Sequence, residues 1–292
     1  MEPGDLRKVG FAMNHSKRKL TAGKDYDLLD NGVIVVRRSY DNLLDPYKKE
    51  RIPHYLSQID HSFRIERKKS YRKALLREET EFNTLVRELE SAGRSLILVF
   101  QGRDAAGKSG AIIRLFEALG FDPKIFQWIP IGPPTDEELE HDYLWRFNKD
   151  DRMPKFGEVR AFDRSWAERV LVEPVMKITS SKLVRKSYAE IRAFEQSLVS
   201  RGHIVVKFWL DITPDEQLRR FRKRAANKPW KYSKADKEAR KHWDDYTGAA
   251  NEMFYRTGTQ FAPWYVLSSE DKRYSRVTVL QVINMVLRAA LR

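Results

Sequence analysis

The 292-residue chain contains no cysteine. This absence excludes disulfide scaffolds, metal sites built from thiolates and catalysis by a thiol nucleophile. Long apolar runs are also missing, since the longest, Leu96–Phe100, is far short of the ~20 residues that span a bilayer. The first ten residues carry acidic residues and glycine where a signal peptide has its apolar stretch, so we expect a cytoplasmic protein without membrane attachment.

Acidic residues are scarce relative to basic ones. Against 41 Asp and Glu stand 55 Lys and Arg, which gives a formal net charge of +14. Such an excess favours polyanionic partners: nucleic acid, an anionic membrane surface or a phosphate-rich substrate. The 7 Trp, 12 Tyr and 15 Phe residues supply material for a hydrophobic core and exclude a fully disordered chain.

The apolar pattern predicts one α/β domain over residues 71–292, preceded by a polar, partly mobile extension over residues 1–70. Buried strands are expected at 95–101, 124–131, 159–163, 204–212 and 264–268. Helices are expected from Tyr71 to about Gly93 and at 108–119, 137–147, 182–200, 214–224 and 277–291. This alternation of strands and helices predicts a parallel sheet with helices on both faces.

Residues 102–109 read GRDAAGKS and match the P-loop, or Walker A, pattern G-x-x-x-x-G-K-[ST] in full. In this motif backbone N–H groups face phosphate oxygens, the lysine reaches the transferred phosphates and the hydroxyl ligates Mg²⁺. The expected ligands are Lys108, Ser109 and the backbone of Gly102, Ala105, Ala106, Gly107 and Gly110. A surface turn could match by chance, but this motif follows the strongest predicted strand and opens a helix.

Two carboxylates suit a metal ion near this loop. Asp104 lies inside the motif, where bound phosphates would repel it unless a divalent cation intervened; the alternative is an Asp that stabilises the turn. Asp163 ends the third predicted strand, the position from which P-loop proteins hold Mg²⁺. The next residue, Arg164, is either a stabiliser of the moving phosphoryl group or a structural ion-pair partner.

A basic segment without acidic residues runs from Arg219 to Lys234. Four-residue spacing places Arg220 with Arg224 on one helix face and Arg219 with Lys223 on another, and Lys228 and Lys231 continue the run. Above a P-loop, such a segment resembles the lid of nucleotide kinases, and we expect this lid at about 214–246.

The order of motifs resembles the polyphosphate kinases of family 2 from about Leu85 onward. The motifs are GRDAAGKSG, PIGPPTDEELEHDYLWRF, FDRSW with RVLVE, VKFWLDITPDEQLRRF, WKYSKAD, KHWDDY and APWYVLSSEDKRY. The resemblance implies a thymidylate-kinase-like fold with a parallel five-stranded sheet and a helical lid. It also implies Mg²⁺-dependent phosphoryl transfer between inorganic polyphosphate and a nucleotide, with AMP favoured as acceptor over ADP or GDP.

The resemblance also assigns roles to residues. Asp104 and Asp163 would hold the metal, Lys108 and Arg164 would bind the phosphates, and lid arginines such as Arg220 and Arg224 would clamp the polyphosphate chain. We further expect a homo-oligomer, either a dimer or a tetramer.

Two other functions remain open. An ATP-dependent nucleoside monophosphate kinase would share the P-loop and the lid. A single-stranded nucleic-acid-binding protein would account for the net charge and for Trp230 and Tyr232 between lysines, but no specific nucleic-acid-binding motif is present.

Overall fold

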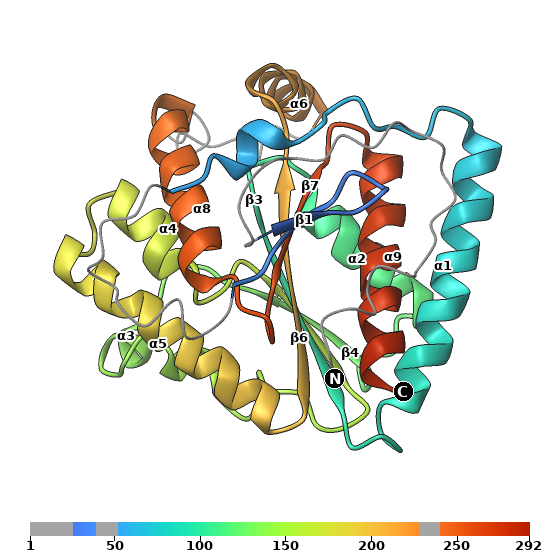
Figure 1. The fold of residues 1–292 in the computed structure, drawn as a ribbon, viewed down its shortest axis with the longest axis horizontal. Coiled ribbons are helices and arrows are strands. Elements are labelled where there is room, and N and C mark those ends of the chain that lie inside the picture. Colours follow the sequence, from blue (N-terminus) through green and yellow to red (C-terminus); the bar gives the residue numbers. More distant parts are fainter. Residues whose placement is uncertain (1–25, 39–51, 228–239) are drawn as a thin grey trace.

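The computed structural model describes residues 26–38, 52–227 and 240–292. Their centre is a seven-stranded sheet in the order β1-β2-β7-β6-β3-β5-β4 (Figure 1). The strands are β1 (Tyr26–Leu28), β2 (Ile34–Val36), β3 (Ser95–Gly102), β4 (Phe126–Pro130), β5 (Val159–Asp163), β6 (His203–Asp211) and β7 (Trp264–Ser268). Strands β3 to β7 pair in parallel, which confirms the α/β fold and the five predicted strands.

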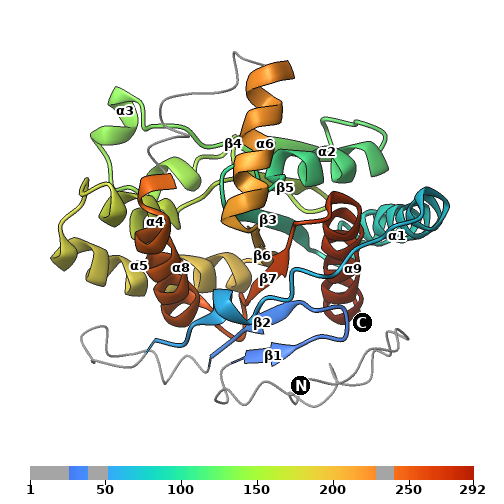
Figure 2. The same cartoon turned by 90° about the horizontal axis from the view of Figure 1, so that it is seen from above.

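The expected count of five strands is too low because a hairpin extends the sheet. Strands β1 and β2 pair antiparallel to each other, and β2 pairs antiparallel to β7 (Figure 2). Both strands are only three residues long and lie in the segment predicted as an extension. Three residues are too few for an alternating pattern to stand out from the surrounding polar sequence.

Helices cover both faces of the sheet. They are α1 (Lys68–Glu88), α2 (Lys108–Ala118), α3 (Asp136–Leu139), α4 (Glu168–Val175), α5 (Ser181–Ser200), α6 (Pro214–Asn227), α8 (Trp243–Thr257) and α9 (Lys272–Ala290). Helices α1, α2 and α9 pack on one face, and α4, α5 and α8 pack on the other (Figure 1). Short 3-10 turns lie at Tyr55–Gln58 and Trp145–Phe147.

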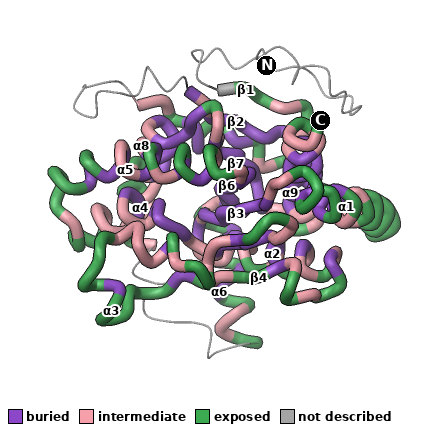
Figure 3. The backbone as a smooth tube through the Cα atoms, turned by 90° about the horizontal axis from the view of Figure 1, so that it is seen from below, coloured by how far each residue is buried: buried purple, intermediate pink, exposed green. Residues whose placement is uncertain are grey.

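Strand β3 shows how the two faces share the core. Leu96, Leu98 and Phe100 belong to the cluster under α1, α2 and α9, whereas Ile97 and Val99 belong to the opposite cluster. Successive side chains of a strand point to opposite faces, so a continuous apolar run is what a strand covered on both sides needs. The central strands are buried along their length (Figure 3). In the described ranges, no helix has the length and apolar content of a membrane-crossing segment.

The predicted helix over 137–147 is wrong. Helix α3 spans four residues and begins with a capping box, in which Thr135 and Glu138 bond each other's backbone N–H. Further on, the Asp142 carboxylate accepts a hydrogen bond from the Leu144 N–H at 2.9 Å. That local bond competes with the helical pattern, so the chain turns and continues as a 3-10 turn.

Candidate phosphate-binding site

The P-loop joins β3 to α2, at the carboxyl edge of the parallel strands. A Cβ on Gly102, whose φ is 143°, would lie 2.2 Å from the Leu210 carbonyl oxygen of β6, so only glycine fits there. Gly107 caps α2 with a φ of 109°, and Ala105 also has a positive φ of 64°. These angles turn the backbone into a concave loop ahead of the helix N-terminus, a geometry suited to anions.

Lys108 lies across the loop. Its Nζ donates to the carbonyl oxygens of Gly102 and Arg103, at 2.9 and 3.2 Å. Burial lowers the pKa of Lys108 despite the nearby Asp104 carboxylate. An ammonium group that is partly desolvated and bonded only to carbonyl oxygens gains from a bound anion.

Ser109 and Asp163 meet at the edge of the sheet. The Ser109 Oγ donates to Asp163 Oδ2 at 2.9 Å. Parallel pairing of β3 with β5 places Asp163 beside Phe100, just before the loop, and this register brings the carboxylate to the first turn of α2. A hydroxyl and a carboxylate so placed are the pair that holds Mg²⁺ in P-loop proteins.

Arg164 bridges two carboxylates. One of its Nη atoms lies 3.4 Å from Asp104 Oδ1 and the other lies 3.5 Å from Glu168 Oε2. Glu168 chiefly raises the pKa of Arg164, and burial raises the pKa of Glu168. The side chain of Arg164 nevertheless remains 43% exposed, so it pairs with protein carboxylates and still faces solvent. The Asp104 carboxylate contacts Arg164 rather than closing the turn on itself.

A cavity of about 230 Å³ opens beside these residues. It is lined by Gln101, Gly102, Arg103, Asp104, Lys108, Arg164, Glu168, Leu171, Val172, Met176, Trp209, Gln217, Trp243 and Tyr246. Glu168, Gln217, Trp243 and Tyr246 were not among the predicted site residues, although Trp243 and Tyr246 lie in the motif KHWDDY and Gln217 in VKFWLDITPDEQLRRF. The two aromatics are three residues apart on α8, a spacing that puts them on one helix face. Because such a pair is equally common in packing, the sequence alone left open whether Trp243 and Tyr246 pack in the protein or contact a nucleotide.

Arg103 ties the loop to α8. Its guanidinium lies 3.9 Å from the centre of the Trp243 ring, donates to Thr247 Oγ1 at 2.6 Å and pairs with the buried Asp211 at 3.3 Å. The residue is itself buried, so its role is to position the loop against the wall of the cavity.

The basic residues of α6 differ in their burial and in their partners. Arg219 pairs with Glu216 on the exposed side of the helix, and Lys223 and Arg224 lie further along it. Contrary to expectation, the Arg220 guanidinium is buried and is bonded to the loop itself: it donates to the carbonyl oxygens of Ala105 and Ala106, both at 2.9 Å. Lys228 and Lys231 lie outside the described residues.

The oxygen ligands fit Mg²⁺. Asp104 and Asp163 both act on Lys108 and Arg164 electrostatically, so the two carboxylates flank one small region that also contains the Ser109 hydroxyl. Among the described residues no group of three or more His, Cys, Asp or Glu side chains forms a metal cluster. Mg²⁺ commonly uses one or two carboxylates and completes its shell with water and substrate phosphates.

Comparison with known proteins agrees with this geometry. The family described as Polyphosphate kinase 2 matches residues 65–291. The chain is 40% identical to a polyphosphate:AMP phosphotransferase of Pseudomonas syringae pv. tomato, over 80% of this chain and 47% of the relative. It is 37% identical to an ADP-polyphosphate phosphotransferase of Rhizobium meliloti, over 72% of this chain and 74% of the relative.

A solved structure also matches. The crystal structure of polyphosphate kinase 2 from Arthrobacter aurescens TC1 has a TM-score of 0.74 and 33% sequence identity, over 80% of this chain and 85% of that chain. The chain spans about half the length of the first curated relative. Family match, sequence identity and fold agree, and the chain belongs to the polyphosphate kinase 2 family.

Proposed function

We propose that this chain transfers a phosphoryl group from inorganic polyphosphate to a nucleotide, with Mg²⁺ and with AMP as the favoured acceptor. The observation that carries the proposal is the convergence of Lys108, Arg164 and the Ser109–Asp163 pair on one edge of the sheet. Phosphoryl transfer requires positioning and neutralisation of charge rather than a covalent intermediate, and these residues supply both.

Each side chain has a distinct task in this proposal. Lys108 moves from the carbonyl oxygens that it now contacts to the oxygens of the transferred phosphoryl group. Arg164, held by Asp104 and Glu168, presents its exposed guanidinium to the same group. Asp104, Asp163 and Ser109 would hold Mg²⁺, which when bound neutralises charge on the phosphate oxygens.

A cluster of cations beside the loop favours a long polyanionic donor. Burial lowers the pKa of Lys272, and neighbouring cations lower it further; these are Arg220, Arg276 and Lys223. The guanidinium of Arg276 lies against the first turn of α2. A Cβ added to Gly110 in that turn would lie only 3.3 Å from Arg276 Nη2. Such mutual repulsion is relieved by a phosphate chain that extends past the loop. Arg224 and Lys223 on α6 would add to this path.

Support for AMP comes from the relatives, whereas the cavity supports a purine nucleotide in general. The first relatives are named for AMP, whereas those named for ADP or GDP are slightly less similar. Trp243 and Tyr246 give the cavity aromatic surface on which a purine base can stack. We also propose that the protein acts in the cytoplasm. We further propose that it forms a homo-oligomer, and light scattering on the purified chain tests this oligomeric state directly.

Product analysis tests the acceptor. The enzyme is incubated with Mg²⁺, polyphosphate and one of AMP, ADP, GMP or GDP, and nucleotides are separated by chromatography. The proposal predicts the highest initial rate with AMP. A higher rate with ADP or GDP would reassign the acceptor but retain the donor. Retention on single-stranded DNA without any phosphoryl transfer would instead favour a nucleic-acid-binding protein.

A further inference from the structure

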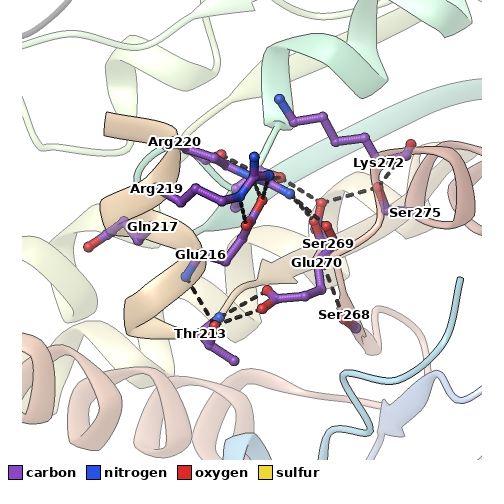
Figure 4. Close-up of polar contacts among 12 residues, drawn as sticks. Thr213, Glu216, Gln217, Arg219, Arg220, Ser268, Ser269, Glu270, Lys272 and Ser275 are labelled. Carbon is purple, nitrogen blue, oxygen red and sulfur yellow. Dashed lines mark hydrogen bonds and ion pairs between the residues drawn. The ribbon is translucent and has the colours of Figure 1, made fainter. Parts of the chain in front are cut away.

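Arg220 is buried, and its guanidinium contacts backbone carbonyl oxygens of the P-loop. One of its Nη atoms donates to the Ala105 and Ala106 carbonyl oxygens, both at 2.9 Å. The other donates to the carbonyl oxygens of Ser269 and Glu270, at 2.6 and 3.0 Å. One guanidinium therefore fastens the P-loop to the loop that follows β7 (Figure 4).

The same cluster fixes the guanidinium. The Arg220 Nε donates to Glu216 Oε1 at 2.5 Å, one helical turn earlier in α6. The start of α6 is itself tied to the loop after β7, since the Thr213 N–H and hydroxyl donate to the Glu270 carboxylate at 3.2 and 2.7 Å (Figure 4). With both ends anchored, Arg220 has little freedom to swing outward to a substrate.

The contacts decide which way the loop's amides point. The Ala106 carbonyl oxygen accepts from Arg220 and also from Ser269 Oγ, at 2.5 Å. In a planar trans peptide the N–H lies opposite the C=O, so the Gly107 N–H of this unit is directed away from Arg220. Within the described residues that N–H donates to no protein acceptor. It is therefore available to a phosphate oxygen.

We propose that Arg220 is a positioning residue, which holds the Ala106 carbonyl oxygen so that the following Gly107 N–H faces the bound phosphates, and which fixes the loop a second time at the Ala105 carbonyl oxygen. The proposal deepens the phosphoryl-transfer function and rests on it for its consequence in turnover. Its neighbour Arg219 shows the contrast: it shares Glu216 but has a side chain 65% exposed, and its hydrogen bonds to described residues go to Glu216 rather than to the loop.

The test measures the loop and the ligand separately in the full-length chain. Hydrogen exchange without ligand follows a peptide that covers residues 100–110, and calorimetry with Mg²⁺ measures the affinity for inorganic tripolyphosphate. Arg220→Ala should speed exchange in this peptide and weaken tripolyphosphate binding by about tenfold or more, the effect of losing a charge-assisted hydrogen bond. Arg220→Lys should restore part of the slow exchange in this peptide and part of the tripolyphosphate affinity. An ammonium keeps the charge but cannot bridge four carbonyl oxygens.

Arg192→Ala is the matched control. Arg192 is also a buried arginine that donates to a backbone carbonyl oxygen, that of Arg256 at 2.9 Å, but it lies on α5. This variant should lose thermal stability while its loop exchange and tripolyphosphate affinity stay at the wild-type values. If Arg220→Ala does not fold, Ser269→Ala removes the second donor to Ala106 and should shift both readouts in the same direction by a smaller amount.

The outcomes separate the possibilities. Unchanged loop exchange in folded Arg220 or Ser269 variants overturns the proposal. Weaker binding with unchanged loop exchange also overturns it and makes Arg220 a direct phosphate ligand. Equal effects in Arg192→Ala overturn it in favour of general destabilisation. If the wild-type chain transfers nothing from polyphosphate while loop exchange still responds to Arg220, the proposed function fails and the positioning role stands.

Discussion

Asp163 Oδ2 accepts a hydrogen bond from Ser109 Oγ at 2.9 Å and so joins the end of β5 to the first turn of α2. The two residues are 54 positions apart, and the parallel register of β3 with β5 is what brings them together. In the proposed function, Mg²⁺ and a phosphate chain would meet the protein at this pair.

Asp163→Asn should remove most of the activity and the response to Mg²⁺. The amide keeps the shape of the side chain but loses the charge, and removing one such electrostatic contact costs about 10²–10³ in rate. Initial rates over a Mg²⁺ titration check this, with Ser109→Ala expected to raise the half-saturating Mg²⁺ concentration and to spare more of the rate. A variant with wild-type rate and Mg²⁺ response would show that Asp163 holds no metal.

Asp104→Asn distinguishes a metal ligand from an ion-pair partner of Arg164. As a ligand, Asp104 should shift the Mg²⁺ titration as Asp163 does. As a partner alone, it should lower the rate at saturating Mg²⁺ without moving the titration midpoint, since only the 3.4 Å contact with Arg164 is weakened. We expect the shift of the midpoint.

Lys108→Ala should abolish transfer and leave the fold intact. Within the described residues, the Lys108 ammonium donates hydrogen bonds only to the carbonyl oxygens of Gly102 and Arg103, and Lys108 belongs to neither core cluster, so its loss removes no packing from the core. We expect a rate at least about 10²-fold lower and a melting temperature changed by only about 2–4 °C. Circular dichroism on heating checks the fold. Near-normal turnover in a folded variant would refute the role given to Lys108.

Glu138 should make stability depend on pH. Burial acts to raise the pKa of Glu138, but the Thr135 N–H and the guanidinium groups of Arg146 and Arg152 outweigh it and hold the pKa below the ordinary 4.5. The resulting stabilisation is complete above pH 4.5 and is lost as the pH falls through the lower, folded-state pKa.

Glu138→Gln tests this dependence. At pH 7 the variant should be less stable by about 2–3 kcal/mol, because two arginines lose a buried charged partner. Urea denaturation from pH 7 down to about pH 3 should show the difference from wild type shrinking only below pH 4.5. A difference that does not change with pH would mean that the Glu138 charge contributes nothing.

Lys272→Ala should weaken the use of polyphosphate more than the use of AMP. Lys272 lies among Arg220, Arg276 and Lys223, and Arg276 lies against Gly110 in the first turn of α2. We expect the apparent KM for polyphosphate to rise about three- to tenfold, and added salt to mimic the change because exposed cations are screened over ~8–10 Å. Steady-state kinetics with each substrate varied in turn provide the comparison. An increase confined to the KM for AMP would place the donor elsewhere.

The parts of the fold and of the site that could be predicted are those encoded by contiguous sequence motifs. The loop from Gly102 to Ser109 is one run of sequence, and the apolar strand before it fixes its place at the sheet edge. Asp163 followed from the rule that carboxyl ends of parallel strands share one edge. The hairpin of β1 and β2 escaped prediction because its stability comes from pairing with β7, far away in the sequence.

Arg220 shows what spacing alone could not reveal. Its place on a basic helix predicted a guanidinium that points outward to a polyphosphate. Instead, the Arg220 guanidinium donates to Glu216 on the same helix and to carbonyl oxygens of two loops that are distant in the sequence. Backbone acceptors carry no sequence signature. Whether an arginine binds a substrate or the protein's own backbone is therefore a property of the folded chain.

The most direct test of the account is the initial rate of ADP formation from AMP with polyphosphate as the sole phosphoryl donor, measured beside the rate with ATP as the sole donor. Both reactions contain Mg²⁺, and Lys108→Ala serves as the blank for contaminating activity. We predict rapid, Lys108-dependent ADP formation with polyphosphate and little with ATP. Transfer from ATP combined with none from polyphosphate would contradict the account and make the protein an ATP-dependent nucleoside monophosphate kinase.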